Sequence, residues 1–399
     1  MDLPARVPQG NVSPARFGLL HAAVFLDLVG FGMLIPDVQL RAEAMGAQGW
    51  LIGLLLASMF VTQLIFSPRW GAASDRLGRK HVFLACTGLS ALGMLVYGLH
   101  DSLLLILASR LLGGLGAANV AVANAWIADL SHGEDQTKAM GRLAAATTSG
   151  LILGPVVTSV LAQAEALPWL GAVGCAFSAL GFVLVALFVP NTPPTAERSP
   201  GRRPIIDLRI LSDLPQLRSM ALIALVAWFS LAMLQGTFGR LIHLNLGYGQ
   251  REFGLIFGYE SLLEVVAQGV LLGWLTSKIA DRHLLRAAYV IQGVGLALTP
   301  FMPDLLALFG ASTLYALGIG LANPLVNTMC SRLTPEDRQG EMFGTLQGAR
   351  SVGFMIGPVL GGVLFDAAPA APYALAGVVC VAAALMVRGI PEKPSTGSP

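Results

Sequence analysis

Four charged side chains stand inside long apolar stretches of this sequence, and they are the strongest candidates for chemistry. Asp27 lies in FLDLVGFGMLIP, Arg110 lies in RLLGGLGAA, and Glu260 and Glu264 lie in GYESLLEVV. A charge withdrawn from water is costly, so such residues tend to be paired, protonated or functional. Carboxyl and guanidinium groups in this setting can load and release protons or bind a charged ligand.

Asp27 and Arg110 are expected at similar depths in their apolar stretches. Asp27 lies ~15 Å into its helix, and Arg110 lies roughly 12 Å from the end of its own, at 1.5 Å per residue. The two side chains could therefore meet. Arginine stays protonated and favours the ionised form of a neighbouring acid, so protonation of the acid would release the arginine. The alternatives are a static ion pair and, for Asp27, a hydrogen bond that only packs one helix against another.

Glu260 and Glu264 are one helical turn apart and share a helix face. Their depths are ~13 and ~19 Å from the end of the helix. Two carboxylates this close in an apolar medium do not both ionise easily, so one is expected to be protonated and to carry protons or bind a cation. Alternatively, they bond to a neighbouring helix or to Arg350, which could instead bind an anionic substrate group.

The composition indicates an integral membrane protein. Of the 399 residues, 55% are hydrophobic and 12% are charged, against roughly 25% charged residues in soluble domains. The mean hydropathy is +0.69. A net charge of +2 offers no basic surface for nucleic acid. We find no nucleotide loop, metal-ligand cluster or Ser/His/Asp arrangement, so we expect no enzyme activity, no metal and no cofactor.

Apolar stretches of about 20 residues can each span a bilayer as a helix. Twelve are predicted, near 17–39, 50–69, 81–99, 102–126, 138–163, 168–190, 217–241, 251–276, 284–302, 304–328, 339–364 and 371–388. They form two six-helix bundles, 17–190 and 216–390, joined by a polar linker at 191–215. Polar tails occupy 1–16 and 391–399.

Lysine and arginine residues predict the orientation in the membrane. With both termini in the cytoplasm, twenty basic residues fall on the inner side and three, Arg41, Arg240 and Arg251, on the outer side. Positive residues concentrate on the cytoplasmic side of membrane proteins. Arg240 and His243 are expected at a solvated outer mouth.

The two halves repeat. GRLAAATTSGLILGPVV from Gly141 aligns with GTLQGARSVGFMIGPVL from Gly344, an offset of 203 residues. The loop 71–80 aligns with 273–282 at an offset of 202, where Ser277 and Ala280 replace Asp75 and Gly78. A parallel duplication of six helices places a substrate site between the halves, near the bilayer midplane.

The loop GAASDRLGRK resembles the segment between helices two and three of the major facilitator superfamily. The resemblance implies the major facilitator fold and a cytoplasmic gate, to which Asp129 belongs as well. The gate residues are Gly71, Asp75, Arg76, Gly78, Arg79 and Asp129. The alternative is a positively charged hairpin that only fixes topology.

Further motifs resemble the twelve-span drug/proton antiporters of that superfamily, including the tetracycline/proton antiporters. Gly150, Gly154 and Pro155 match the antiporter motif of helix five, where small residues allow close packing and proline bends the helix. The resemblance ties Arg110 to proton coupling. The tetracycline exporters carry an acid where this chain has Gly93, a histidine near Glu264 and an acid near Gln292, so we do not predict tetracycline as the substrate.

The resemblance implies proton-coupled export of small amphipathic compounds, driven by the proton gradient. We expect a monomer in the bacterial inner membrane, with the lipid bilayer, protons and the substrate as its partners. Residues predicted to line the substrate cavity are Asn119, Asn124, Gln235, Phe257, Gln292, Asn323 and Arg350. Alternatives are a metabolite importer or facilitator, a lipid or lysolipid flippase, and a receptor that does not transport.

Overall fold

A computed structural model describes residues 14–130, 133–191, 213, 215–335 and 338–389. These residues form helices and short connections without a strand. The predicted C-terminal tail, most of the predicted N-terminal tail and nearly all of the linker 191–215 lie outside the described residues. Helix α1 begins at Pro14, inside the segment predicted as a tail.

Six helical stretches form the N-terminal half. They are α1 (Pro14–Ala44), α2 (Gly49–Leu77), α3 (Arg79–Tyr97), α4 (Leu103–Gly116) with α5 (Asn119–Leu130), α6 (Gly133–Gln163), and the turn η1 (Leu167–Trp169) with α7 (Leu170–Phe188). The fourth predicted span is thus broken into α4 and α5. Glycines 113, 114 and 116 precede the break and weaken the helix there.

Six more stretches form the C-terminal half. They are α9 (Pro215–Leu246), α10 (Gln250–Val266) with the π-turn η2 (Ala267–Leu271) and α11 (Leu272–Thr276), α12 (Asp281–Leu298) with η3 (Thr299–Phe301), α13 (Leu305–Leu333), α14 (Gln339–Ala367), and α15 (Ala371–Met386) with η5 (Val387–Gly389). Asp304 caps α13 by accepting a hydrogen bond from the Ala307 amide at 2.8 Å.

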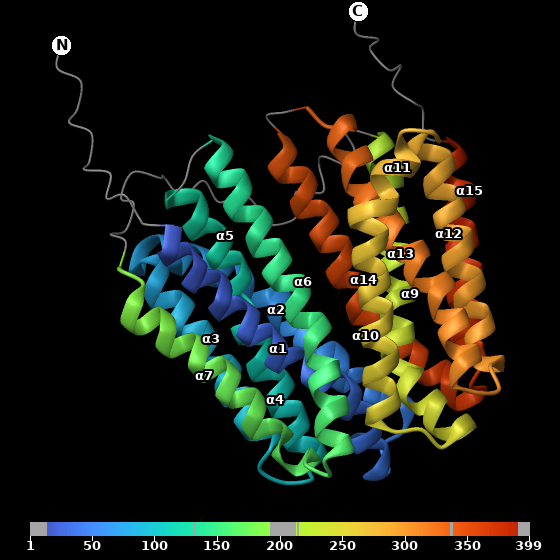
Figure 1. Cartoon of the computed structure of the whole chain (residues 1–399), viewed down its shortest axis with the longest axis horizontal. Coiled ribbons are helices and arrows are strands. Elements are labelled where there is room, and N and C mark those ends of the chain that lie inside the picture. Colours follow the sequence, from blue (N-terminus) through green and yellow to red (C-terminus); the bar gives the residue numbers. More distant parts are fainter. Residues whose placement is uncertain (1–13, 131–132, 192–212, 214, 336–337, 390–399) are drawn as a thin grey trace, which may run out of the picture.

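Eleven helical stretches of the described residues are long and apolar enough to cross a membrane, and α15 is a shorter apolar helix that completes twelve. Figure 1 shows two bundles side by side, with α6 of one facing α10 and α14 of the other. Within the first, α1 packs on α6 and α7; within the second, α9 packs on α14 and α15. This is the predicted fold of two six-helix bundles.

The chain alternates between two ends of the bundles. We call the end where α1 begins and η5 ends the termini end, and the end where α1 leads into α2 the opposite end (Figure 1). The ribbons of α6 and α14 diverge toward the termini end (Figure 1). The polar contacts described below between the halves all lie at the opposite end.

Close backbone contact joins the halves at the opposite end. A Cβ added to Gly53 of α2 would fall 2.6 Å from the Cα of Val359 in α14, so only glycine fits there. Helices α6 and α10 also touch, and Ser159 donates a hydrogen bond of 2.7 Å to the Arg251 carbonyl. The space between the halves is therefore closed at this end.

Candidate functional site

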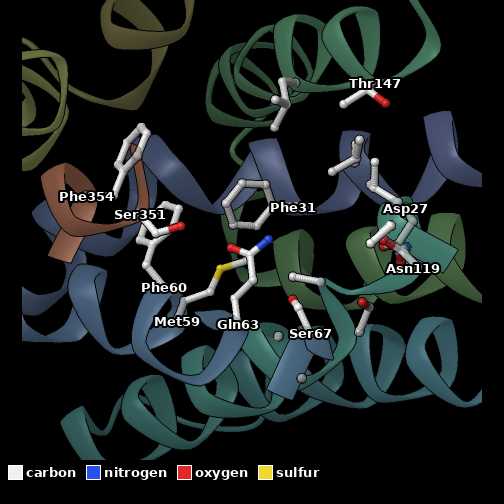
Figure 2. Close-up of a pocket in the computed structure, with 18 of the residues that line it drawn as sticks. Asp27, Phe31, Met59, Phe60, Gln63, Ser67, Asn119, Thr147, Ser351 and Phe354 are labelled. Atoms are coloured by element: carbon white, nitrogen blue, oxygen red, sulfur yellow. The ribbon is translucent and has the colours of Figure 1, made fainter. Parts of the chain in front are cut away.

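A cavity of about 600 Å³ lies between the two halves. Most of its wall comes from α1 to α6, and α14 supplies Gln347, Arg350, Ser351 and Phe354. Figure 2 shows Asp27 beside Asn119 at one end and Phe354 near Phe60 at the other. The ring of Phe60 stacks on Phe354 with centroids 4.5 Å apart. Such a volume suits an organic molecule of moderate size.

Asp27 is the acid of this cavity. Its side chain is 3% exposed, and Oδ2 accepts a hydrogen bond of 2.6 Å from the Asn119 amide nitrogen. Its Oδ1 has no partner among the described residues. The break between α4 and α5 places Asn119 at the start of α5. The acid is therefore held by a neutral donor and not by a cation.

Arg110 lines the same cavity but forms no ion pair with Asp27, so the meeting of these two side chains that the helix depths suggested does not occur in this structure. Arg110 is 4% exposed, and its Nε has no hydrogen-bond partner in the described part of the chain. Its guanidinium carbon lies 5.7 Å from the centre of the Phe31 ring. Equal depth along two helices leaves open whether their side chains face each other.

Arg350 reaches the cavity from α14. Its guanidinium carbon lies 3.8 Å from the centre of the Trp228 ring, a close cation–π contact. Its Nε likewise lacks a hydrogen-bond partner within the described residues. The structure records no ion pair between Arg350 and either glutamate of α10, which was one of the arrangements left open by the sequence.

Glu260 and Glu264 lie inside the C-terminal bundle and are not among the cavity-lining residues. Ser312 of α13 donates a hydrogen bond of 2.6 Å to Oε1 of Glu260, and Glu260 is 6% exposed. The backbone of Glu264 packs against Gly320 of α13. Both glutamates therefore lie on α10 beside α13, and neither borders this cavity.

Three of the residues predicted for the substrate cavity line it, namely Asn119, Asn124 and Arg350. The four others lie elsewhere in the C-terminal half: Gln235, Phe257, Gln292 and Asn323. The carbonyl of Gln235 accepts a hydrogen bond from Gln39 at the opposite end. Phe257 stacks on Phe253, with centroids 4.5 Å apart. Gln292 is fully buried, and neither of its amide atoms has a described partner.

Several apolar cavity residues gave no sequence signal. They are Phe31, Met59, Met94, Leu151 and Phe354. In a chain in which more than half of the residues are hydrophobic, such side chains cannot be told from lipid-facing ones by type alone. Only the packing of the helices selects them.

The predicted gate residues form one cluster at the termini end. Arg79 is 8% exposed and contacts Asp75 at 2.6 Å and Asp129 at 2.8 Å. Gly78 has φ of 92°, which lets α2 turn into α3 through a single residue. Arg76 is exposed, and a side chain at Gly71 would meet open space. The three charged partners come from α2, α3 and α5, so this cluster ties helices within one half.

At the opposite end, a second charge cluster joins the two halves. We call it the Arg240 latch. Arg240 of α9 contacts Glu43 of α1 at 3.0 Å and Asp366 of α14 at 3.0 Å, and Asp366 also accepts a 2.7 Å hydrogen bond from the Gly49 amide of α2. Arg240 is 8% exposed. The expectation of a solvated mouth at Arg240 is therefore wrong, because Arg240 is buried between two acids. Both acids lie far from Arg240 in the sequence, so its local sequence does not reveal them.

The motif residues Gly150, Gly154 and Pro155 lie on α6 between α1 and α10. A Cβ on Gly154 would fall 2.6 Å from the Cα of Gly32, and one on Gly150 would fall 2.7 Å from the Phe25 carbonyl oxygen. These glycines allow α6 to lie against α1 nearly backbone to backbone. Pro155 faces Gly254 of α10 in the other half.

Known proteins match most of this chain. The family model described as "Major Facilitator Superfamily" matches residues 20–249 and 220–399. Multidrug resistance protein 1 of Bacillus subtilis is 26% identical over 87% of this chain and 89% of its own length. Tetracycline resistance protein, class C, of Escherichia coli is 26% identical over 90% of this chain and 92% of its own length.

A solved structure supports the fold. The nucleoside transporter NupG superposes with a TM-score of 0.74 at 13% identity, covering 94% of this chain and 98% of its own. Two helical bundles with a cavity between them are also what a transporter of this architecture requires. The family model and the architecture together show that this membrane protein belongs to the major facilitator superfamily of transporters.

Proposed function

We propose that this chain is a proton-coupled antiporter that exports small amphipathic compounds from a bacterial cell by alternating access. The names of its relatives, which include a multidrug resistance protein and a tetracycline resistance protein, support export of foreign compounds. The excess of basic residues in the loops of the termini end supports placing that end in the cytoplasm. In that orientation the cavity serves the cytoplasmic side.

The observation that carries the proton coupling is Asp27, an acid in the cavity wall that no described cation neutralises. The hydrogen bond to its Oδ2 comes from the neutral amide of Asn119. Gain or loss of a proton at Asp27 therefore changes the charge of the cavity by one, with no salt bridge to compensate. Since the acid and the substrate share one cavity, a change of charge at the acid alters the affinity for the substrate.

The two charge clusters then correspond to one conformation of the transport cycle, in which the proposed outer end is closed. In this structure the Arg240 latch closes the proposed outer end, while the Arg79 cluster binds helices of a single half. Exchange of the substrate to the outside requires the latch to part and the termini end to close. Large changes of this kind occur as rigid-body rocking of the two bundles.

Everted membrane vesicles loaded with a panel of fluorescent amphipathic dyes test the proposal. Imposing a proton gradient, acid inside, should drive dye uptake and release protons from the vesicle. Asp27→Asn should abolish uphill uptake but keep dye binding, because asparagine preserves the size of the side chain and can still hydrogen-bond to Asn119. Asp101→Asn is the matched control, since Asp101 is 75% exposed and pairs with Arg41.

Uphill uptake that survives in both the Asp27→Asn and the Glu264→Gln variants would refute proton coupling through these acids. Dye that leaves the vesicle when the gradient is imposed would indicate import. A chain that neither moves a dye nor releases protons in response to one would favour the receptor alternative. A lipid or lysolipid that alone stabilises the purified protein to heat would favour the flippase.

A further inference from the structure

The cavity between the halves carries unbalanced positive charge. Its ionisable lining residues are Asp27, Arg110 and Arg350. Two guanidinium groups therefore face one carboxyl group, and that carboxyl group is already bonded to Asn119. The cavity carries a net charge of about +1 with Asp27 ionised and about +2 with Asp27 protonated. In either state it lacks an anion.

Three described acids outside the cavity are bonded to other groups, and Glu264 is not among the residues that line the cavity. Glu260 is bonded to Ser312 within the C-terminal bundle. Glu43 and Asp366 are held by Arg240 at the opposite end. In the described part of the chain, neither cavity arginine forms a hydrogen bond or an ion pair to any side chain. A buried cation without an anion is unfavourable, so the arrangement is completed by something outside the chain.

The contacts that the arginines do make leave their donors free. Arg350 lies on the face of Trp228 at 3.8 Å, and Arg110 lies near the ring of Phe31 at 5.7 Å. Contacts with a ring face orient a guanidinium group without using its N–H donors in the plane. The Nε atoms of both arginines are buried and unpartnered within the described residues. A guanidinium fork matches the two oxygens of a carboxylate, sulfonate or phosphate.

The remaining wall suits an aromatic body. Phe31, Phe60 and Phe354 line the cavity, and Phe60 and Phe354 stack across the two halves. Figure 2 shows Phe31 between Asp27 and the Phe60–Phe354 pair. A planar ligand can lie among these rings, since offset or edge-on aromatic contacts are favourable.

We propose that the substrate is an aromatic organic anion whose acidic group binds Arg350. Arg350 belongs to α14 in the C-terminal half and Arg110 to α4 in the N-terminal half. Each half therefore contributes one cation to the wall of the cavity that would hold the anion. This inference rests on the proposed function in one respect, namely that the cavity is the substrate-binding site used in transport.

Binding to the purified full-length protein in a non-ionic detergent tests the proposal without any proton gradient. The probes are three forms of one aromatic body: 2-naphthoate, the neutral 2-naphthamide and the cationic 2-naphthylmethylammonium. The series is repeated with pyrene in place of naphthalene to fill more of the cavity. We expect each anion to bind at least tenfold more tightly than its neutral amide, and each cation to bind more weakly than the amide.

Substitutions of Arg350 assign the preference to the site. Arg350→Gln should bring the affinity of the anion close to that of the amide, while Arg350→Lys should keep part of the preference because the charge remains. Arg251→Gln is the matched control, because Arg251 is an exposed arginine at the opposite end. Binding of the neutral amide to Arg350→Gln reports that the variant is folded.

Two results of these binding measurements would overturn the proposal. The first is that no anion in either series binds more tightly than its amide. The second is that the preference for the anion survives in Arg350→Gln. Failure of the proposed function is distinguishable: a protein that prefers anions but moves no protons refutes antiport alone. Proton-driven export of cationic dyes that is unaffected by Arg350→Gln refutes the anion site alone.

Discussion

Replacement of Arg240 by glutamine should open the end of the molecule that this structure shows closed. The substitution removes both ion pairs of the latch, to Glu43 and to Asp366, each at 3.0 Å. It also leaves these two carboxylates close together without a cation between them. The packing of Gly53 of α2 against α14 remains, so the halves should separate more often but should not lose their fold.

The magnitude follows from the burial of the three groups. A hydrogen bond to a charged group contributes about 1.5–3 kcal/mol, and solvent exposure lowers this figure. The side chain of Arg240 is 10% exposed, whereas that of Asp366 is 35% exposed. We therefore expect the two pairs together to stabilise the closed opposite end by ~2 kcal/mol, which is about a 30-fold shift in the equilibrium.

Distances between spin labels at the opposite end measure that equilibrium. Ala44 in the N-terminal half and Ala368 in the C-terminal half are both exposed and suit cysteine labelling, in a background in which the four native cysteines are replaced. Double electron–electron resonance spectroscopy should show a single short distance between the labels in the parent protein and a larger population of long distances in Arg240→Gln.

Arg41→Gln provides the control, since Arg41 pairs with Asp101 at the same end and at 2.7 Å but within one half. It should leave the distances unchanged. An unchanged distribution in Arg240→Gln, or an equal change in Arg41→Gln, would show that the latch does not hold the halves together.

Two further predictions concern the stability of the N-terminal half, measured by thermal unfolding in detergent. Arg79→Ala should destabilise it by about 3 kcal/mol, because the largely buried ion pair between Arg79 and Asp129 is lost; an equal loss in the exposed Arg76→Ala would contradict this reasoning. Gly154→Ala should destabilise it by about 1–3 kcal/mol through overpacking against α1. Gly141→Ala should be tolerated, because a Cβ there meets open space, and equal melting temperatures for these two glycine variants would contradict the packing argument.

Features that depend on local sequence were predictable. The length of the apolar stretches predicted the spans, and the fold of two bundles followed from the repeat between them. The sharp turn at Gly78 followed from a glycine flanked by charged residues. The spans and the turn depend on residues close together in the chain, and the repeat is visible by aligning one half of the sequence with the other, so the sequence alone contains this information.

The partner of Asp27 was not predictable in this way. Helical rise gives the depth of a residue in a span, and Asp27 and Arg110 indeed both border the cavity. The direction in which each side chain points depends on the rotation of its helix and on the break between α4 and α5. That break brings Asn119 to the acid, at 2.6 Å, and Arg110 has no anionic partner among the residues that the structure describes.

The ion pairs at the termini end likewise include one that the sequence comparison missed and the structure shows. The loop motif seemed degraded in the second half, where Ser277 replaces Asp75. The structure shows that an ion pair is nevertheless present with its charges exchanged: Arg79 binds Asp129 in the first half, and Asp281 binds Arg332 at 2.5 Å in the second. An alignment by residue type scores such an exchange as a loss, whereas an ion pair still joins the two helices, although the Arg332 side chain is 63% exposed.

The sequence by itself determined that this chain crosses a membrane many times, as two related halves with ionisable groups in apolar surroundings. Those properties follow from the cost of placing charge and unpaired backbone in hydrocarbon, which acts on each segment separately. Only the tertiary structure decided which acid borders the cavity, which arginines lack an anion, and that Arg240 joins α1 to α14 across the halves. These depend on helix rotation and on contacts between residues 126 and 197 positions apart, which no local pattern encodes.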